Sequence, residues 1–254
     1  MIAMSSDHFS PLATQYATFR PDYPNELFDW LLNITPVHRL AWDCGTGNGQ
    51  AAIALAARFE QVLGTDISAA QLASAPTSPN IEYRVTPAER SGLADKTVDL
   101  ITVAQALHWF DLPRFYTEAQ RALKPAGVIA VWGYNRLQID SPEMQAILDR
   151  FYDETIGAYW PPERVHVENA YRDFPFPFTH ITAPQFALAK EWDRTHLLGY
   201  LRSWSAVGRF QTANGFDPVV ALAAEIAPHW PEGKTFRIEW PLFIHVGRMK
   251  SLHH

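Results

Sequence analysis

Residues 41–49 read Ala-Trp-Asp-Cys-Gly-Thr-Gly-Asn-Gly, and this stretch decides the fold. An apolar run at 40–44 leads into the glycines, and an Ala-rich run at 50–58 follows them. Glycines let the chain turn sharply and let a ligand approach the backbone closely. A helix that starts after such a turn presents free N–H groups to that ligand. The pattern therefore predicts a strand, a ligand-binding turn and a helix, in that order.

The spacing of the glycines separates two kinds of cofactor. The dinucleotide fingerprint is G-x-G-x-x-G, whereas Gly45, Gly47 and Gly49 are spaced G-x-G-x-G. Asp43 lies two residues before the first glycine, where a carboxylate would repel a pyrophosphate. It suits a cofactor with a cationic methionine end. The turn favours S-adenosylmethionine; a nicotinamide dinucleotide, or a loop without a ligand, is the alternative.

Strand and helix patterns alternate on both sides of this turn. Such alternation predicts βαβ units around a parallel sheet, so the predicted fold class is α/β and Rossmann-like. In such sheets ligands bind beyond the carboxyl ends of the strands. The predicted strands are 40–44, 61–65, 81–85, 98–104 and 128–132, with helices at 25–32, 50–58, after Ser68 and at 113–123, and with a turn at 124–127.

Candidate site residues follow three of these strands. Asp66 ends the second strand and could bind the ribose hydroxyls, although it fits NAD equally well and an Asp there is often a helix cap. Ala88 and Glu89, after the third strand, could read the adenine edge, unless the acid is only solvated. Gln105, after the fourth, could meet the methionine amine through its backbone or its side chain. His108 has an unperturbed pKa near neutrality and could act as a general base, or it could only shape the pocket.

The segment before the sheet carries Tyr16, Arg20, Pro21 and Tyr23. It could fold over the site as a lid. Arg20 could then pair with the carboxylate of the cofactor, and the two tyrosines could shield its sulfonium. The alternative is an N-terminal arm that aromatic residues pack in place.

The second half is rich in aromatic residues. Trp192, His196, Tyr200 and Trp204 recur every four residues, which predicts one helical stripe. Lys234–Val246 predicts a final strand that Pro241 interrupts. The residues chosen for their chemistry as candidate substrate contacts are Tyr23, His108, Trp109, Trp160, Tyr200, Trp204 and Arg209. For those beyond residue 135, core packing or a solvated surface position is the alternative.

Composition bounds the remaining possibilities. The chain has 254 residues, 47% of them hydrophobic and 19% charged, which is enough for one large domain. The net charge of −6 argues against non-specific nucleic-acid binding. Cys44 is the single cysteine, so a reducing cytoplasm is expected. No secretory signal, membrane span or metal-ligand cluster is expected, and the oligomeric state is not readable.

The chain resembles class I methyltransferases, and within them the small-molecule group that includes trans-aconitate methyltransferases. The likeness lies in Tyr16–Pro24, Trp42–Gly49, Gly64–Asp66, Ala104–Asp111 and Tyr200–Ser205. It implies a seven-stranded sheet whose last strand is antiparallel, with 183–191 and 236–247 as strands six and seven. It also implies the cofactor contacts, which are Tyr16, Arg20, Asp43, Gly45, Thr46, Gly47, Gly49, Asp66, Ile67, Ala88, Glu89 and Gln105.

The expected reaction is an in-line methyl transfer from S-adenosylmethionine to a small molecule, with a carboxylic acid among the acceptors considered. His108 is the candidate base if the acceptor is a phenol or an amine. The rival functions are a cofactor-binding protein without methyl transfer and an NAD-dependent oxidoreductase. One domain is expected over 1–254, with a lid at 1–35, a cofactor core at 36–135, a substrate-facing cap at 136–233 and the final strand at 234–248.

Overall fold

A computed structural model describes residues 22–249. Within them the chain forms a mixed sheet of nine strands in the order β3-β2-β1-β4-β5-β9-β6, with β7 and β8 also paired to β9. The strands β1 to β5 run parallel, and β9 is antiparallel to β5. The strands are β1 Leu40–Cys44, β2 Gln61–Asp66, β3 Ile81–Val85, β4 Val98–Ala104, β5 Leu123–Tyr134, β6 Gln138–Ile139, β7 Thr179–Ile181, β8 Ala187–Trp192 and β9 Phe236–Arg248.

Several helices, namely α4, α5, α6, α8 and α10, begin after a Ser or Asp whose side chain caps the first turn. Ser68, for example, accepts a hydrogen bond from the backbone of Gln71 at the start of α4, as predicted. None of the helices between residues 22 and 249 is long and apolar enough to cross a membrane. The helices are α2 Asn25–Ile34, α3 Gln50–Ala56, α4 Ala69–Ala73, α5 Leu112–Ala122, α6 Pro142–Arg150, α7 Arg164–Glu168, α8 Arg194–Arg202, α9 Ser205–Asn214 and α10 Pro218–Ile226, with shorter turns at Leu107–Trp109, Phe151–Thr155, Gly157–Tyr159 and Ala227–His229.

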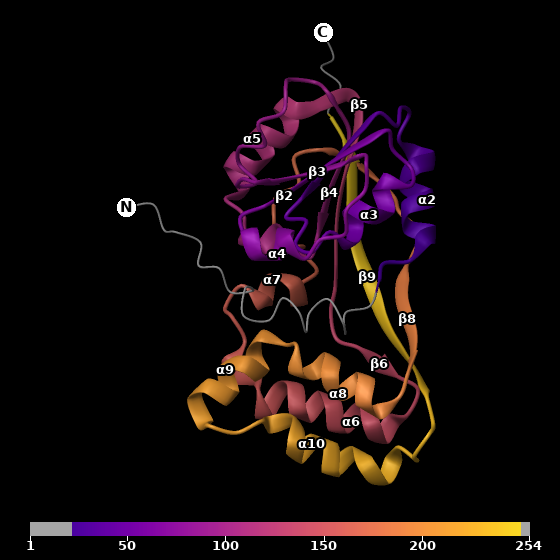
Figure 1. Cartoon of the computed structure of the whole chain (residues 1–254), viewed down its shortest axis with the longest axis vertical. Coiled ribbons are helices and arrows are strands. Elements are labelled where there is room, and N and C mark those ends of the chain that lie inside the picture. The colour runs from indigo at the N-terminus through magenta and orange to yellow at the C-terminus, as the bar shows by residue number, and fades with distance from the viewer. Residues whose placement is uncertain (1–21, 250–254) are drawn as a thin grey trace.

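Helices cover both faces of the parallel strands (Figure 1). Side chains alternate between the two faces along each strand, so β5 contributes to two hydrophobic clusters. Ile129 and Val131 pack with α5, whereas Ala130 and Trp132 pack with α2 and α3. This layering is the predicted α/β fold.

The strand count differs from the seven that the resemblance implied, because two of the strands are broken. β6 pairs with β9 just beyond β5, with the register shifted by one residue, so β6 continues β5. In the same way β7 and β8 follow one another along β9 with a one-residue shift. The predicted strands six and seven correspond to β8 and β9, the latter antiparallel as implied.

Two local predictions were wrong. The expected turn at 124–127 lies inside β5, because Val98 already pairs with Leu123 and the ladder then bulges before Val128. Pro241 does not interrupt β9. It lies where β9 passes from pairing with β5 to pairing with β6, so the missing N–H of proline costs no bond to either strand.

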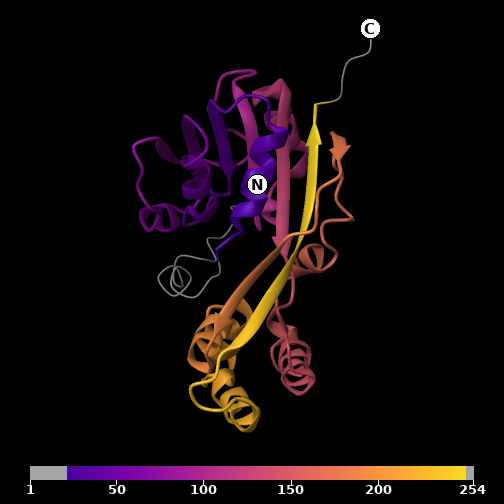
Figure 2. The same ribbon diagram turned by 90° about the vertical axis from the view of Figure 1, so that its right-hand side faces the viewer.

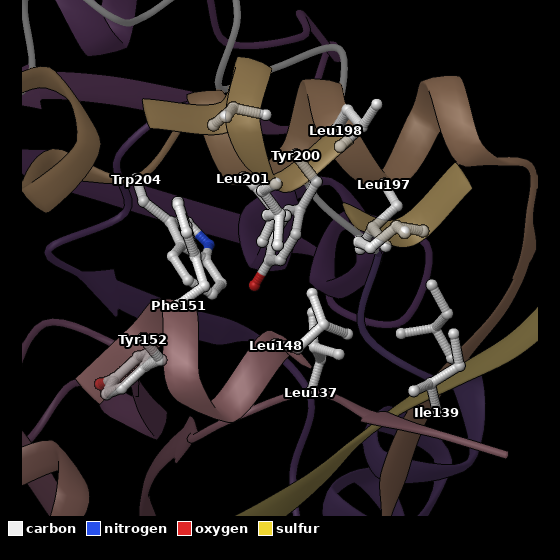
Figure 3. Packing of buried hydrophobic residues seen from close by; sticks show 14 of the residues in the cluster. Leu137, Ile139, Leu148, Phe151, Tyr152, Leu197, Leu198, Tyr200, Leu201 and Trp204 are labelled. Carbon is white, nitrogen blue, oxygen red and sulfur yellow. The ribbon is translucent and has the colours of Figure 1, made fainter. Parts of the chain in front are cut away.

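Residues 142–226 supply a helical layer at one end of the molecule, formed by α6, α8, α9 and α10 (Figures 1 and 2). The layer lies beyond the carboxyl ends of the parallel strands, because β5 runs toward it and continues into β6. It has its own hydrophobic cluster, which includes Leu148, Leu201 and Trp204 (Figure 3). β9 extends from this cluster into the parallel sheet and joins the two parts.

The four aromatic residues at 192–204 were predicted to lie on one helix, and this prediction was wrong. Trp192 ends β8, His196 and Tyr200 lie on α8, and Trp204 caps the start of α9. The rings still contact each other in series, with centroids 4.6 to 5.6 Å apart. A strand end and two helices therefore build what a four-residue period suggested for one helix.

Candidate functional site

The glycine turn between β1 and α3 is shaped by positive backbone angles. Gly45 has φ +68° and Gly49 has φ +80°, in the region that disfavours side chains. A Cβ on Gly45 would lie 2.6 Å from Cβ of Ala106, so the turn packs closely against the segment after β4. The backbone N–H groups of Gly45 and Thr46 both donate to the carbonyl of Thr65. The turn is thus fixed between β2 and the segment after β4.

Asp43 lies beneath this turn, at the end of β1. It is fully buried, and its two oxygens accept hydrogen bonds from the hydroxyls of Thr46, at 2.5 Å, and Thr102, at 2.7 Å. Burial raises the pKa of this carboxyl to about 6, although both hydroxyls oppose the shift. The carboxylate therefore supports the turn and places negative charge directly under it.

Asp66 joins the first turn to the second. One of its oxygens accepts from the backbone of Gly47 and the other from the backbone of Ser68, each at 2.9 Å. Ile67, between them, is about half exposed. A carboxylate at the end of this strand suits the hydroxyl groups of a ligand beside the turn.

The space beside Gly47 tests whether S-adenosylmethionine fits. Among residues 22–249 a Cβ built on Gly47 would meet no atom closer than 3.9 Å, so they leave this side of the turn open. Asp43 and Asp66 lie close enough that the charge of Asp66 also raises the pKa of Asp43. Two carboxylates around an open glycine suit a cation and disfavour a pyrophosphate. The residues present therefore fit the sulfonium cofactor better than a dinucleotide.

The segment after β3 lies at the edge of the same site and is bonded to the segment after β4. Ala88 is buried, and Oε1 of Glu89 accepts a hydrogen bond from the backbone of Asp111 at 2.8 Å. This bond connects the segment after β3 with the one after β4. The adenine contact predicted for Ala88 and Glu89 stays a prediction.

Gln105 uses its side chain internally. Its amide accepts from the backbone N–H of Tyr134 at 2.9 Å and donates to the carbonyl of the same residue at 3.1 Å. The backbone of Gln105 has φ +57°, which is uncommon for a residue with a side chain. Contact with the methionine amine was predicted through either the side chain or the backbone of Gln105. Because the side chain is bonded internally, the backbone carbonyl is the better candidate.

His108 lies in the short turn Leu107–Trp109 that follows β4. Its Nδ1 is 2.8 Å from the hydroxyl of Tyr171, and its ring packs on Trp109. Burial, and then the nearby charges of Arg164 and His166, lower the pKa of His108 to about 3. An imidazole with this pKa is neutral and a weak proton acceptor near pH 7, which argues against the predicted role as general base.

The helical layer contributes an aromatic and cationic group through α7 and the residues before it. Arg164 lies over the ring of Trp160, 5.0 Å from the centroid, and its Nε donates to the hydroxyl of Tyr152 at 2.9 Å. α7 itself packs against the turn that carries His108. The side chains near His108 thus include donors from both parts of the molecule.

The other predicted residues are spread around this region. Tyr16 and Arg20 lie outside the described residues. Tyr23 packs edge-on against Trp132 at 5.5 Å. Arg209 is half-buried on α9, and no ion pair to it occurs within residues 22–249.

Two of the predicted substrate contacts are packed in the helical layer (Figure 3). Tyr200 is almost fully buried there, and its hydroxyl accepts from the indole of Trp240 at 3.1 Å. Trp204 is also buried and contacts Tyr152 and Trp160. Packing, the alternative considered from the sequence, describes these two side chains within the described residues.

Sequence reasoning missed Thr102, Arg164 and Tyr171. Thr102 could have been found, because it is a polar residue inside the otherwise apolar strand 98–104, beside the strand that ends at Asp43. Arg164 and Tyr171 carry no comparable signal. They lie in a Pro-rich and aromatic stretch that shows neither strand nor helix periodicity over its length.

Comparisons with known proteins agree with this geometry. A family model described as a methyltransferase domain matches residues 42–131. A Dictyostelium discoideum protein named as a methyltransferase is 38% identical over 214 residues, covering 83% of this chain and 81% of its own. A solved structure from Anaeromyxobacter dehalogenans, described as a type II methyltransferase, has a TM-score of 0.86 at 42% identity and covers 91% of this chain and 98% of its own.

A more distant structure shows the same fold. It is a Haemonchus contortus N-methyltransferase in complex with phosphomonomethylethanolamine and S-adenosylhomocysteine, with a TM-score of 0.50 at 14% identity, covering 98% of this chain and 61% of its own. The turn, the strand-end carboxylate and these relatives support the methyl-donor cofactor and not the nicotinamide alternative. The chain therefore belongs to the class I S-adenosylmethionine-dependent methyltransferases.

Proposed function

We propose that this enzyme transfers the methyl group of S-adenosylmethionine to a carboxylate oxygen of a small molecule, as in the trans-aconitate-like group that its sequence resembles. The observation that carries the proposal is the guanidinium of Arg164. Within residues 22–249 no carboxylate pairs with it, although it is half-buried beside the turn of His108. A partly buried cation without an anion is costly unless a ligand supplies the charge.

The surroundings of Arg164 support an anionic ligand. Glu168, the acid on the same helix, accepts from the hydroxyl of Tyr152 at 2.7 Å instead. The ring of Trp160 lies beneath the guanidinium, and its buried indole Nε1 has no hydrogen-bond partner among residues 22–249. The guanidinium can only donate hydrogen bonds, and a carboxylate can accept from it.

The residues of the chain would divide the work as follows. When bound, S-adenosylmethionine supplies a methyl carbon that an acceptor oxygen displaces from sulfur in line. The glycine turn and Asp66 hold the cofactor, and Asp43 places a negative charge beneath it. Arg164 orients the acceptor, and positioning of this kind is a major source of rate acceleration. A carboxylate is already a nucleophile near neutral pH, so the chain needs no strong base.

A screen with isotope-labelled S-adenosylmethionine would test the proposal directly. Carboxylic acids, phenols and amines are compared, and label in an ester product is expected from the acids. Labelled ethers or amines, with no ester, would overturn the carboxylate assignment. No product from any class, with tight cofactor binding by calorimetry, would support the rival function of a cofactor-binding protein.

Arg164→Gln then tests the acceptor site. Loss of a charge-assisted bond is expected to raise KM for the acid by about tenfold or more, while calorimetry shows unchanged S-adenosylmethionine binding. Arg164→Lys keeps the charge and is expected to recover part of the loss. Arg172→Gln is the matched control, because Arg172 is exposed on the following segment. Equal effects of the Arg164 and Arg172 substitutions would remove the argument for this site.

The remaining expectations stay predictions. They are a small-molecule acceptor without nucleic-acid or membrane partners, a cytoplasmic location, and a lid formed by the residues before the sheet. A substrate-facing role for the helical layer is part of the present proposal.

A further inference from the structure

We infer that Tyr171 holds His108 as the tautomer with its proton on Nε2, so that His108 is a neutral hydrogen-bond donor in the acceptor site and not a base. Tyr171 is thereby a positioning residue that acts through His108. The assignment of the tautomer rests on the geometry alone. Its consequence for the acceptor rests on the proposed function.

The contact between the two side chains is direct and enclosed. The Tyr171 hydroxyl lies 2.8 Å from Nδ1 of His108, and Tyr171 is almost fully buried. Burial raises the pKa of the Tyr171 phenol, so this residue keeps its proton. The pair therefore shares a single hydrogen bond, in which either the Tyr171 hydroxyl or the His108 Nδ1 is the donor.

Burial decides that direction. Within residues 22–249 the hydrogen-bond partner of the buried Tyr171 hydroxyl is Nδ1 of His108, so a proton on Nδ1 would leave the hydroxyl without an acceptor. The hydroxyl proton then points to Nδ1, which accepts. A neutral imidazole carries one N–H, so the proton of His108 lies on Nε2.

The chain accepts backbone strain to place this hydroxyl. Ala170 and Tyr171 both have φ +53°, and neither is a glycine. Such residues persist only where the surroundings determine them, and they gather at functional sites. Here the Ala170 carbonyl is 2.8 Å from Nε2 of His245, and the Tyr171 ring stacks on Phe174 at 5.3 Å. The segment is held firmly in the conformation that reaches His108.

The far side of the imidazole is left for a ligand. Within residues 22–249 no side chain or backbone group bonds to Nε2 of His108. Arg164 is close enough for its charge to lower the pKa of the ring. The guanidinium of Arg164 and a protonated Nε2 of His108 are both hydrogen-bond donors. A site of this kind suits an acceptor that has lone pairs and no proton to lose. A carboxylate meets this description, whereas a phenol or an ammonium group does not.

Nitrogen NMR of the protein without acceptor tests the tautomer. Uniform ¹⁵N labelling and long-range ring correlations identify which nitrogen carries the proton, and His108→Gln assigns the signals. A protonated Nε2 with an unprotonated Nδ1 near neutral pH is expected. A proton on Nδ1, or on both nitrogens, would overturn the inference. This result does not depend on whether any acid is methylated.

Removal of the hydroxyl tests the positioning role. Tyr171→Phe is expected to give a mixture of both tautomers. Tyr116→Phe is the matched control, because the Tyr116 hydroxyl is also buried but has no hydrogen-bond partner among residues 22–249, so the wild-type tautomer should persist. An unchanged tautomer in Tyr171→Phe would contradict the role of Tyr171. If Tyr171→Phe does not fold, the wild-type spectrum still decides the assignment.

Kinetics with the identified acid would complete the test. Tyr171→Phe is expected to lower kcat/KM by about tenfold, and Tyr116→Phe by less than about twofold. Cofactor affinity should stay unchanged in both. Equal losses in the two variants would mean that the hydroxyl acts only through packing.

Discussion

The hydroxyl of Thr102 on β4 donates a 2.7 Å hydrogen bond to the carboxylate of Asp43, its direct neighbour on β1. The cross-strand pair is buried beneath the glycine turn. Burying a carboxylate is unfavourable, and two hydroxyl groups offset only part of the cost, as the raised pKa shows. The site therefore keeps a destabilising charge where the cofactor needs one.

Asp43→Asn is expected to stabilise the folded protein at neutral pH by ~1–3 kcal/mol. The carboxyl has a pKa of 3.8 when unfolded and about 6 when folded, so the folded state holds the proton more tightly. Wild-type stability from this group is complete below pH 3.8 and is lost as the pH rises through about 6. Urea unfolding at several pH values measures the difference between variant and wild type, which should grow across this interval. A constant difference would show that Asp43 does not titrate there. Calorimetry should show weaker S-adenosylmethionine binding in the variant.

Gly45→Ala is expected to destabilise the protein by ~2–4 kcal/mol and to abolish cofactor binding. The new Cβ would lie 2.6 Å from Cβ of Ala106, and the alanine would have to adopt the positive φ of Gly45. Gly215→Ala is the control, because Gly215 has φ +79° but no atom of the described part of the chain lies within 4 Å of a new Cβ. Its cost should be limited to ~1 kcal/mol from the backbone. If thermal unfolding gives the two variants equal losses, the close approach between the turn and Ala106 is wrong.

The imidazole of His108 is expected to stay neutral as the pH falls through the usual range for histidine. Its pKa is lowered to about 3, with burial as the main cause and the charges of Arg164 and His166 as smaller ones. Because the unfolded chain binds this proton more readily, His108 should lower stability as the pH falls from 6.5 toward 3. A ¹H–¹³C NMR titration follows the ring, and His108→Gln identifies its signal. A midpoint near 6.5 would contradict the enclosed position of the ring.

Lys124→Gln is expected to destabilise the protein by ~1–3 kcal/mol. Asp99 is buried, accepts from the backbone of Arg39 and Leu40, and pairs with Lys124 at 2.6 Å. Removing the lysine leaves a buried carboxylate with no cation beside it. Chemical denaturation measures the loss, and Lys190→Gln provides a control, since Lys190 pairs with a mostly exposed Asp22. Similar small losses in both variants would show that Asp99 does not need its partner.

The cofactor half of the fold could be predicted because its signals are local. The glycine turn, the apolar strand 98–104 and the cap at Ser68 each depend on residues close together in sequence. The bulge between Leu123 and Val128 was missed because it is a feature of the pairing between β5 and β4, which the local sequence does not show. A turn and a bulge share the same small and polar residues, and only the partner strand distinguishes them.

The acceptor half was harder to predict for a similar reason. Tyr171 approaches His108 from 63 positions further along the chain, through a backbone conformation that nothing in its own sequence requires. Tyr200 shows the opposite difficulty. Its helical spacing is real, but the same spacing serves a buried core and a ligand site equally well. The high density of aromatic residues could not distinguish side chains that line a ligand site from side chains that pack in a hydrophobic core.

β9 has one more consequence. Its first half is built into the helical layer and its second half into the parallel sheet, while the two parts keep separate hydrophobic clusters. Changes among α6, α8, α9 and α10 can therefore accumulate without disturbing the glycine turn. If the helical layer binds the acceptor, as proposed, this architecture can exchange one acceptor for another along a single shared strand while the cofactor turn is kept.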